Sequence, residues 1–264
     1  MEQQQRTRLI GGLIGLMVFA VGWDLVHRPS APAPATPPAP VDVGATTPSL
    51  PATRSRAGTE IASVDTTGPS YFDLVARAEI RRRIRASYPL TYLGVIVAES
   101  SDSMLHRWDD RVGRPVRVHL AGDTIANFQP GFLEAVRQAF GRWEQAGVPV
   151  RFDLGADSSD AEVRFSWRTQ FSIDRTGETD LEWDREGHLR TAQVTIATFD
   201  PRGHPLGSDD VRVVALHEIG HLIGLDHSPD STDLMYAKAV VRDLSPRDIR
   251  TAQLLYELAP GSLR

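Results

Sequence analysis

The order of apolar and polar residues downstream of residue 71 predicts both strands and helices. Alternation, which puts every second side chain on one face of a strand, predicts strands at residues 116–120, 150–154, 163–167, 181–183 and 193–197. Apolar residues at helical spacing predict helices at residues 72–88, 93–108, 132–143 and 211–223. Strands and helices in this order indicate an α+β fold.

The N-terminal segment has the pattern of a membrane-targeting sequence. Arg6 and Arg8 precede an uncharged run at residues 9–23, and a basic end followed by an apolar run directs a chain to a membrane. Two interpretations fit: residues 1–28 are a retained anchor with its basic end in the cytoplasm, or they contain a signal peptide that is cleaved near Ala20. We favour the anchor because of the segment that follows, and both place the remaining chain outside the cytoplasm.

Residues 29–70 are predicted to form a flexible stalk. Proline and alanine dominate residues 29–51, and proline favours extended, semi-rigid conformations that build no core. A disordered leader without function is the alternative. Residues 71–105 are interpreted as a helical accessory segment, and residues 106–264 as the folded body. For residues 52–105 three interpretations stay open: a propeptide, a spacer or part of that body.

Composition removes several classes of function. The net charge is −5 and the charged fraction is 24%, so the chain lacks the excess of basic residues that is typical of a nucleic-acid-binding protein. The chain contains no cysteine. Disulfides, thiolate catalysis and zinc sites built on sulfur are therefore excluded, and any metal must be held by His, Asp or Glu.

Residues 217–227 carry the main candidate chemistry. His217 and His221 are four positions apart, so on a helix both side chains reach the same metal. Glu218 projects from the same turn. Gly224 permits a turn that other residues resist, and this turn returns His227 as a third ligand. Three imidazoles with one position left for water are the arrangement of a catalytic zinc site.

The segment downstream identifies a family. Met235, within the sequence Asp-Leu-Met-Tyr at residues 233–236, follows His227 by eight positions. Here the chain resembles the metzincins, in which a structural Met-turn lies beneath the metal site. Ser228, directly after the third histidine, and a C-terminal helix at residues 244–256 are similar to the matrixin branch, the family of the matrix metalloproteases.

This resemblance covers about residues 106–258, and it implies a fold and an activity. The expected fold is a zincin-like catalytic domain at residues 106–264, with a mixed twisted sheet, an active-site helix and a C-terminal helix. The implied activity is that of a zinc endopeptidase, in which Glu218 activates a zinc-bound water. One zinc is the expected cofactor. A protein or peptide substrate is expected to extend along a sheet edge, formed by either residues 181–183 or residues 193–197.

Two other functions remain as alternatives. One is an extracytoplasmic protein that binds zinc but is catalytically silent, although it would not require Glu218. The other is a zinc hydrolase that acts on small non-peptide substrates, which the resemblance disfavours.

The chain departs from the matrixin pattern at several positions. It lacks the propeptide cysteine that keeps animal matrixins latent, and Ala237 replaces the proline that usually follows the Met-turn tyrosine. His188 and His204 are interpreted as surface residues, because no structural-zinc cluster surrounds them in the sequence. A calcium site is possible at a group of three carboxylates, but a solvated turn is the simpler interpretation; the group is Asp180, Asp184 and Glu186.

Overall fold

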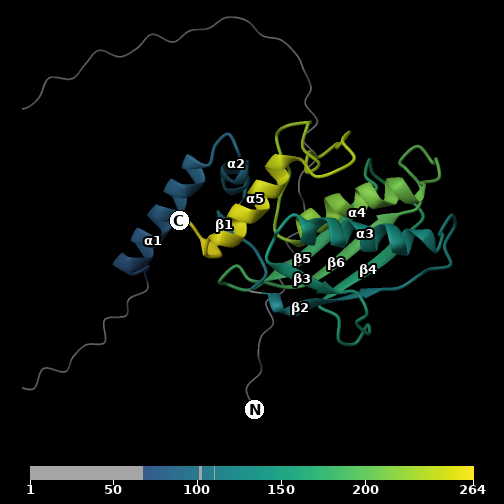
Figure 1. Cartoon of the computed structure of the whole chain (residues 1–264), viewed down its shortest axis with the longest axis horizontal. Coiled ribbons are helices and arrows are strands. Elements are labelled where there is room, and N and C mark those ends of the chain that lie inside the picture. The colour runs from purple at the N-terminus through teal and green to yellow at the C-terminus, as the bar shows by residue number, and fades with distance from the viewer. Residues whose placement is uncertain (1–67, 101–102, 110) are drawn as a thin grey trace, which may run out of the picture. The chain divides into compact units, whose positions relative to one another are not determined.

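Five strands form one mixed sheet in the computed structural model, which describes residues 68–100, 103–109 and 111–264. In chain order they are β2 (Arg111–Leu120), β3 (Val150–Asp153), β4 (Val163–Arg168), β5 (Gly177–Trp183) and β6 (Leu189–Ala197). Across the sheet the order is β3-β2-β4-β6-β5, and Figure 1 labels all five strands. The first four strands in this order are parallel, and β5 runs antiparallel to β6 at one edge.

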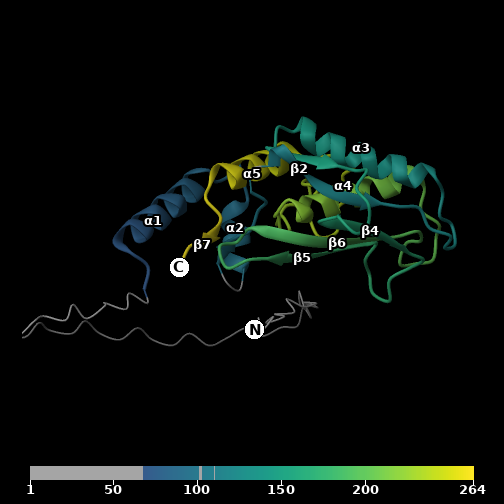
Figure 2. The same cartoon turned by 90° about the horizontal axis from the view of Figure 1, so that it is seen from below.

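Five helices accompany the sheet in the described residues. They are α1 (Tyr71–Ala86), α2 (Leu93–Glu99), α3 (Gly131–Gln145), α4 (Ser208–Leu222) and α5 (Pro246–Glu257). Helices α3 and α4 pack together on one face of the sheet (Figure 2). The indole nitrogen of Trp143 donates a hydrogen bond to the Leu216 carbonyl at 2.8 Å, which joins the two helices. On the sheet side, the rings of Phe140 and Phe165 lie 5.5 Å apart.

The alternation predicted for β4 and β6 explains this one-sided packing. Val163, Phe165 and Trp167 of β4 are buried, and the residues between them are more exposed. In the parallel register Phe165 lies beside Val194 of β6, which is also buried. Period-two burial of this kind is expected for a sheet with one face on the core and the other toward solvent.

Helix α2 packs against both α1 and α5. Ile84, Tyr92, Leu93 and Ile96 belong to the same buried core as α3 and α4. A second, two-stranded sheet pairs β1 (Met104–Leu105) with β7 (Gly261–Ser262). Residues upstream of 106 therefore contribute side chains to the core around the active-site helix.

The prediction of a single helix over residues 93–108 is wrong. Helix α2 ends at Glu99, Ser100 is extended, and Ser103 has a positive φ of 53°. Residues 100–103 are Ser-Ser-Asp-Ser, and such side chains compete with the helix for backbone hydrogen bonds. The chain then enters β1, where pairing with β7 replaces helical hydrogen bonds.

The α+β fold class is confirmed, with the mixed sheet and both expected helices. The C-terminal helix predicted from residue 244 begins at Pro246, after Ser245 caps it with hydrogen bonds from the amides of Arg247 and Asp248. In the part of the chain that the structure describes, no helix combines the length and apolar character needed to span a bilayer. The predicted N-terminal anchor and most of the predicted stalk lie outside the described residues.

Candidate metal centre

Helix α4 brings two of the predicted ligands together. Its core-facing residues, among them Val211, Leu216 and Ile219, are fully buried, so packing rather than local propensity stabilises this helix. His217 and His221 lie one turn apart, and their ring centroids are 4.9 Å from each other. The four-residue spacing therefore has the geometric result predicted for it.

Gly224 makes the turn that returns the third histidine. Its φ is +101°, and a Cβ at this position would lie 2.0 Å from the carbonyl oxygen of His106. Only glycine fits both constraints. The chain then places the His227 ring 5.4 Å from that of His217 and 4.8 Å from that of His221. Potential ligand atoms of the three histidines all lie within 4.8 Å of one another.

Hydrogen bonds determine which ring nitrogens are available. Nδ1 of His217 lies 2.8 Å from the Leu234 carbonyl oxygen, and Nδ1 of His221 lies 2.9 Å from that of Leu225. Since a carbonyl oxygen only accepts, each Nδ1 carries the proton and each Nε2 keeps a lone pair. The two helical histidines thus present the tautomer that binds a metal through Nε2.

Burial keeps these imidazoles neutral. It lowers the pKa of His217 to about 4 and that of His221 well below its ordinary value of 6.5. Burial also lowers the pKa of His227, although the nearby Asp226 carboxylate acts in the opposite direction. Because the neutral imidazole is the ligating form, this donor set fits a zinc ion.

Glu218 lies beside the ligands and is only 5% exposed. Oγ1 of Thr179, on β5, donates a hydrogen bond of 2.7 Å to Oε2 of Glu218. Burial raises the pKa of Glu218 to about 7, against the hydrogen bond from Thr179, which lowers it. A Cβ at Gly177 would lie 2.3 Å from Oε1 of Glu218. The start of β5 therefore approaches the carboxylate closely because residue 177 is glycine.

Met235 packs directly behind the active-site helix. It is fully buried, and a Cβ at Gly220 would lie 2.2 Å from its sulfur. Its carbonyl oxygen accepts a hydrogen bond of 2.8 Å from the amide of Ser228. The turn that contains Met235 is thereby attached both to α4 and to the residue after His227.

A comparison with protein families agrees with this arrangement. The model of the family described as Matrixin matches residues 121–257, just over half of the chain. The chain belongs to the matrixin family.

Several curated proteins are similar to parts of this matrixin. "Metalloendoproteinase 1" of Glycine max is 27% identical over 143 residues, which are 49% of this chain and 47% of that protein. "Metalloendoproteinase 1-MMP" of Arabidopsis thaliana is 29% identical over 133 residues, 46% of this chain and 36% of the plant protein. "Probable matrix metalloproteinase 095L" of Invertebrate iridescent virus 3 is 41% identical over 77 residues, 28% and 20% of the two chains. The chain spans less than half the length of each of these relatives.

The other candidate ligands of this matrixin have different partners. His188 lies 3.1 Å from Asp109, and His204, on the surface, lies 2.9 Å from Asp200. Asp184 binds Arg190 and accepts hydrogen bonds from two amides of its own turn, at Glu186 and His188. Within the described part of the chain, no other group of three His, Asp or Glu residues brings its ligand atoms as close together as the three histidines do. A calcium site has no support.

The sheet order decides between the two candidate edges. Strand β6, with residues 193–197, is paired on both sides, by β4 and β5. Strand β5, with residues 181–183, is the outermost strand next to α4. The edge beside Glu218 is therefore β5, and no motif around Gly177 or Thr179 in the sequence indicates their contact with this carboxylate.

Proposed function

We propose that this matrixin is a zinc-dependent endopeptidase. The convergence of three neutral imidazoles supports the proposal most strongly, because three nitrogen ligands leave one position for water or substrate, as in catalytic zinc sites. His217, His221 and His227 would hold the ion. When bound, zinc supplies a Lewis acid that polarises the scissile carbonyl and acidifies a water molecule.

Glu218 is proposed as the general base. Its carboxylate projects from the turn that carries His217 and is oriented by the hydroxyl of Thr179 at 2.7 Å. In this position it accepts a proton from the attacking water and returns it to the departing amine. Gly177 leaves room for the carboxylate, since a larger residue there would displace it.

The free edge of β5 is proposed to bind the substrate. Main-chain groups of an edge strand pair with an extended peptide, and this pairing tolerates many side chains. Strand β5 pairs only with β6 among the described strands, and its first residues adjoin Glu218. A peptide added along β5 would therefore pass beside the proposed base.

We also propose that the protein acts outside the cytoplasm. The basic residues and apolar run of residues 1–28 support a retained anchor, and the proline-rich sequence of residues 29–51 supports a stalk behind it. Secretion after cleavage of a signal peptide is the alternative. Mass determination of the N-terminus in isolated membranes distinguishes the two.

The activity is tested on the full chain with two matched substitutions. Glu218→Gln removes the proposed base, and Glu134→Gln makes the same chemical change on the exposed side of α3, away from β5, where Glu134 lies 3.8 Å from Arg137. We expect about one zinc per chain in all three proteins. Cleavage of a mixed peptide library should fall by about 100- to 10,000-fold in Glu218→Gln alone.

Removal of the metal provides the second arm of the test. A chelator should abolish cleavage by the wild type, and added zinc should restore it. A wild-type chain that binds zinc but cleaves no peptide would favour a silent zinc-binding protein or an inhibitory propeptide within residues 52–105.

A further inference from the structure

Tyr92 lies outside the part of the chain that matches the family, yet it contacts helix α5, which packs beside the candidate metal centre. The match begins at residue 121, and Tyr92 directly precedes helix α2. Its side chain is 1% exposed. Its hydroxyl donates a hydrogen bond of 3.0 Å to Oδ1 of Asp248 in the first turn of α5, and its amide donates one of 3.1 Å to Oγ1 of Thr251.

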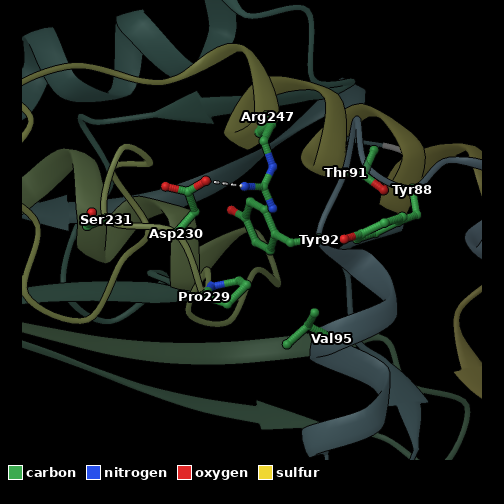
Figure 3. Close-up of a pocket in the computed structure, with 8 residues that line it drawn as sticks. All are labelled: Tyr88, Thr91, Tyr92, Val95, Pro229, Asp230, Ser231 and Arg247. Atoms are coloured by element: carbon green, nitrogen blue, oxygen red, sulfur yellow. Dashed lines mark hydrogen bonds and ion pairs between the residues drawn. The ribbon is translucent and has the colours of Figure 1, made fainter.

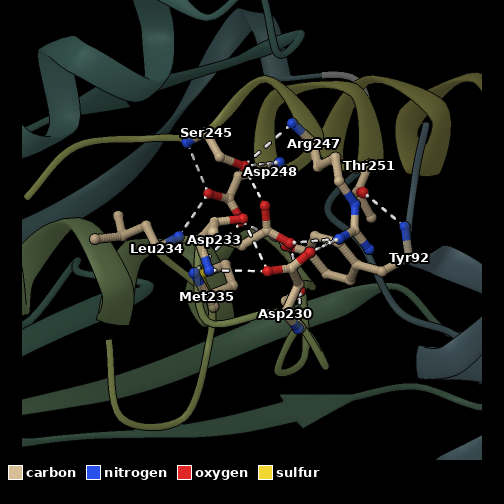
Figure 4. A network of polar contacts seen from close by, with 11 residues as sticks. Tyr92, Asp230, Asp233, Leu234, Met235, Ser245, Arg247, Asp248 and Thr251 are labelled. Atoms are coloured by element: carbon tan, nitrogen blue, oxygen red, sulfur yellow. Dashed lines mark hydrogen bonds and ion pairs between the residues drawn. The ribbon is translucent and has the colours of Figure 1, made fainter. Parts of the chain in front are cut away.

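Asp248 holds the backbone of the Met-turn (Figure 4). Its Oδ2 accepts a hydrogen bond of 2.9 Å from the amide of Leu234, and its Oδ1 lies 3.4 Å from the amide of Met235. Asp248 is completely buried, so its carboxylate oxygens need hydrogen-bond donors from the protein. The hydroxyl of Tyr92 donates to the same Oδ1 atom.

Two metal ligands are attached to the backbone that Asp248 holds. The Leu234 carbonyl accepts the hydrogen bond from Nδ1 of His217. The Met235 carbonyl accepts the hydrogen bond from the amide of Ser228, the residue after His227. These hydrogen bonds, joined through the backbone of Leu234 and Met235, thus lead from Tyr92 through Asp248 to His217 and to Ser228, the residue next to His227.

Arg247 adds a second connection between the same elements. Its guanidinium lies 5.6 Å from the centre of the Tyr92 ring and forms ion pairs with Asp230 at 3.0 Å and Asp233 at 3.2 Å. Ser228 donates a hydrogen bond to the same carboxylate of Asp233. The loop after His227 is therefore also fixed to α5 beneath Tyr92.

A pocket of about 380 Å³ lies between residues 88–99, called the segment below, and the loop that follows His227 (Figure 3). Residues of the segment, among them Tyr88 and Val95, line one side, and Pro229 and Ser231 line the other. Arg247 also lines this pocket and connects its two sides through the Tyr92 ring and Asp230.

We propose that Tyr92 is a positioning residue for His217 and His227, and that residues 88–99 are part of the catalytic body rather than a removable propeptide or spacer. The inference rests on the proposed function, because it assigns Tyr92 a role in holding the ligands of that zinc site. Without the tyrosine hydroxyl, Oδ1 of Asp248 keeps, among the contacts of the described residues, the long one with the Met235 amide. The Met-turn, and the two histidines attached to it, would then be less well fixed.

The test compares Tyr92→Phe with Thr198→Val in the full chain. Phenylalanine keeps the buried ring and removes only the hydroxyl. Thr198→Val likewise removes one buried hydroxyl, which donates to the Ala126 carbonyl at 2.7 Å, away from the network. The readouts are zinc affinity by competition with a chelating dye, thermal stability, and kcat and KM on one peptide.

We expect the zinc affinity of Tyr92→Phe to fall by about tenfold, the lower end for residues that support metal ligands, and kcat to fall while KM changes little. Thr198→Val should lose comparable thermal stability and keep wild-type zinc affinity. Equal zinc affinity in Tyr92→Phe and the wild type, or equal losses in the two variants, would overturn the positioning role alone. A wild-type chain that binds no zinc would overturn the proposed function and this inference together.

Discussion

Oγ1 of Thr179 lies 2.7 Å from Oε2 of Glu218, so the edge strand β5 orients the carboxylate of helix α4. The same hydroxyl also lies 3.2 Å from the backbone carbonyl of Glu218. This contact links the strand proposed to bind the substrate to the group proposed to take its proton. The base on α4 would therefore have a fixed position relative to a peptide docked on β5.

Thr179→Val should lower kcat without a large change in KM. Valine has the same shape, so the variant loses only the contacts of this hydroxyl with the carboxylate and the backbone carbonyl of Glu218. A hydrogen bond to a charged group contributes about 1.5 kcal/mol or more, which corresponds to about tenfold in rate if it is needed in the transition state. Steady-state peptide cleavage measures this. Thr191→Val is the control, since Thr191 makes a bond of 2.7 Å to the exposed Glu182; an equal loss in the control would contradict the specific role of Thr179.

Gly224→Ala should separate His227 from the other ligands. The added Cβ would meet the His106 carbonyl at 2.0 Å, and the backbone has a φ of +101°. Gly203→Ala is the matched control, because its φ is +84° with nothing within 4 Å. The control should lose only the roughly 1–2 kcal/mol of left-handed strain, and Gly224→Ala should in addition lose about 100-fold or more in zinc affinity. Similar zinc affinities in the two variants would show that the turn does not place His227.

A buried ion pair predicts acid sensitivity. Oε1 of Glu162 lies 2.7 Å from the guanidinium of Arg111, whose side chain is 4% exposed. Burial alone would raise the pKa of Glu162, but hydrogen bonds from the Arg117 amide and from Arg111 outweigh it and lower the pKa below 4.5. Since the folded-state pKa is the lower one, the unfolded chain binds more protons in this range. The stabilisation is complete above the ordinary pKa of 4.5 and is lost as pH falls below it through the lower folded-state pKa.

Glu162→Gln should therefore flatten the fall of the melting temperature with acid. At neutral pH the variant should be less stable than the wild type by about 2 kcal/mol, because Arg111 keeps its buried charge without a carboxylate. Glu134→Gln, in an exposed pair with Arg137 at 3.8 Å, should change neither value much. Thermal melts across this pH range give both quantities, and parallel curves for Glu162→Gln and wild type would refute the assignment.

The cluster of three histidines could be predicted from the sequence because its geometry is local. His217 and His221 share a helix face, and Gly224 with its positive φ returns His227 within six residues of His221. The presence of strands could also be predicted, from the alternation of apolar and polar residues. Which strand lies at the edge was not, because residues 181–183 and 193–197 have the same pattern, and only pairing with β4 distinguishes them.

Contacts between distant parts of the chain could not be predicted. Thr179 and Glu218 are 39 positions apart, and Tyr92 and Asp248 are 156 positions apart. A threonine in a strand and a tyrosine before a short helix are common, and neither forms a motif. The helix predicted over residues 93–108 was too long for a related reason. Leu105 lies in a strand instead, because it pairs with Gly261 at the other end of the chain.

Gly220→Ala tests the contact between the active-site helix and the Met-turn. The new Cβ would lie 2.2 Å from the Met235 sulfur and 3.3 Å from the Trp143 ring. Overpacking of this kind costs about 1–3 kcal/mol. Gly141→Ala, within α3 and with nothing inside 4 Å, should instead stabilise the protein by about 0.5–1 kcal/mol, as alanine does in a helix. Thermal or urea unfolding measures both, and opposite signs are the expected result.

A double-mutant cycle identifies Met235 as the residue that the new methyl group meets. Met235→Ala alone should destabilise by about 2–5 kcal/mol, as a buried methionine truncation does. In the combined variant, the alanine at 220 occupies space that the methionine has left, so the loss should be smaller than the sum of the two single losses. Additive losses would mean that the clash is relieved elsewhere, against Trp143 or by movement of α4. A loss in the double variant that is smaller than the sum of the single losses would establish that residue 220 is glycine so that the turn at Met235 can lie directly against helix α4.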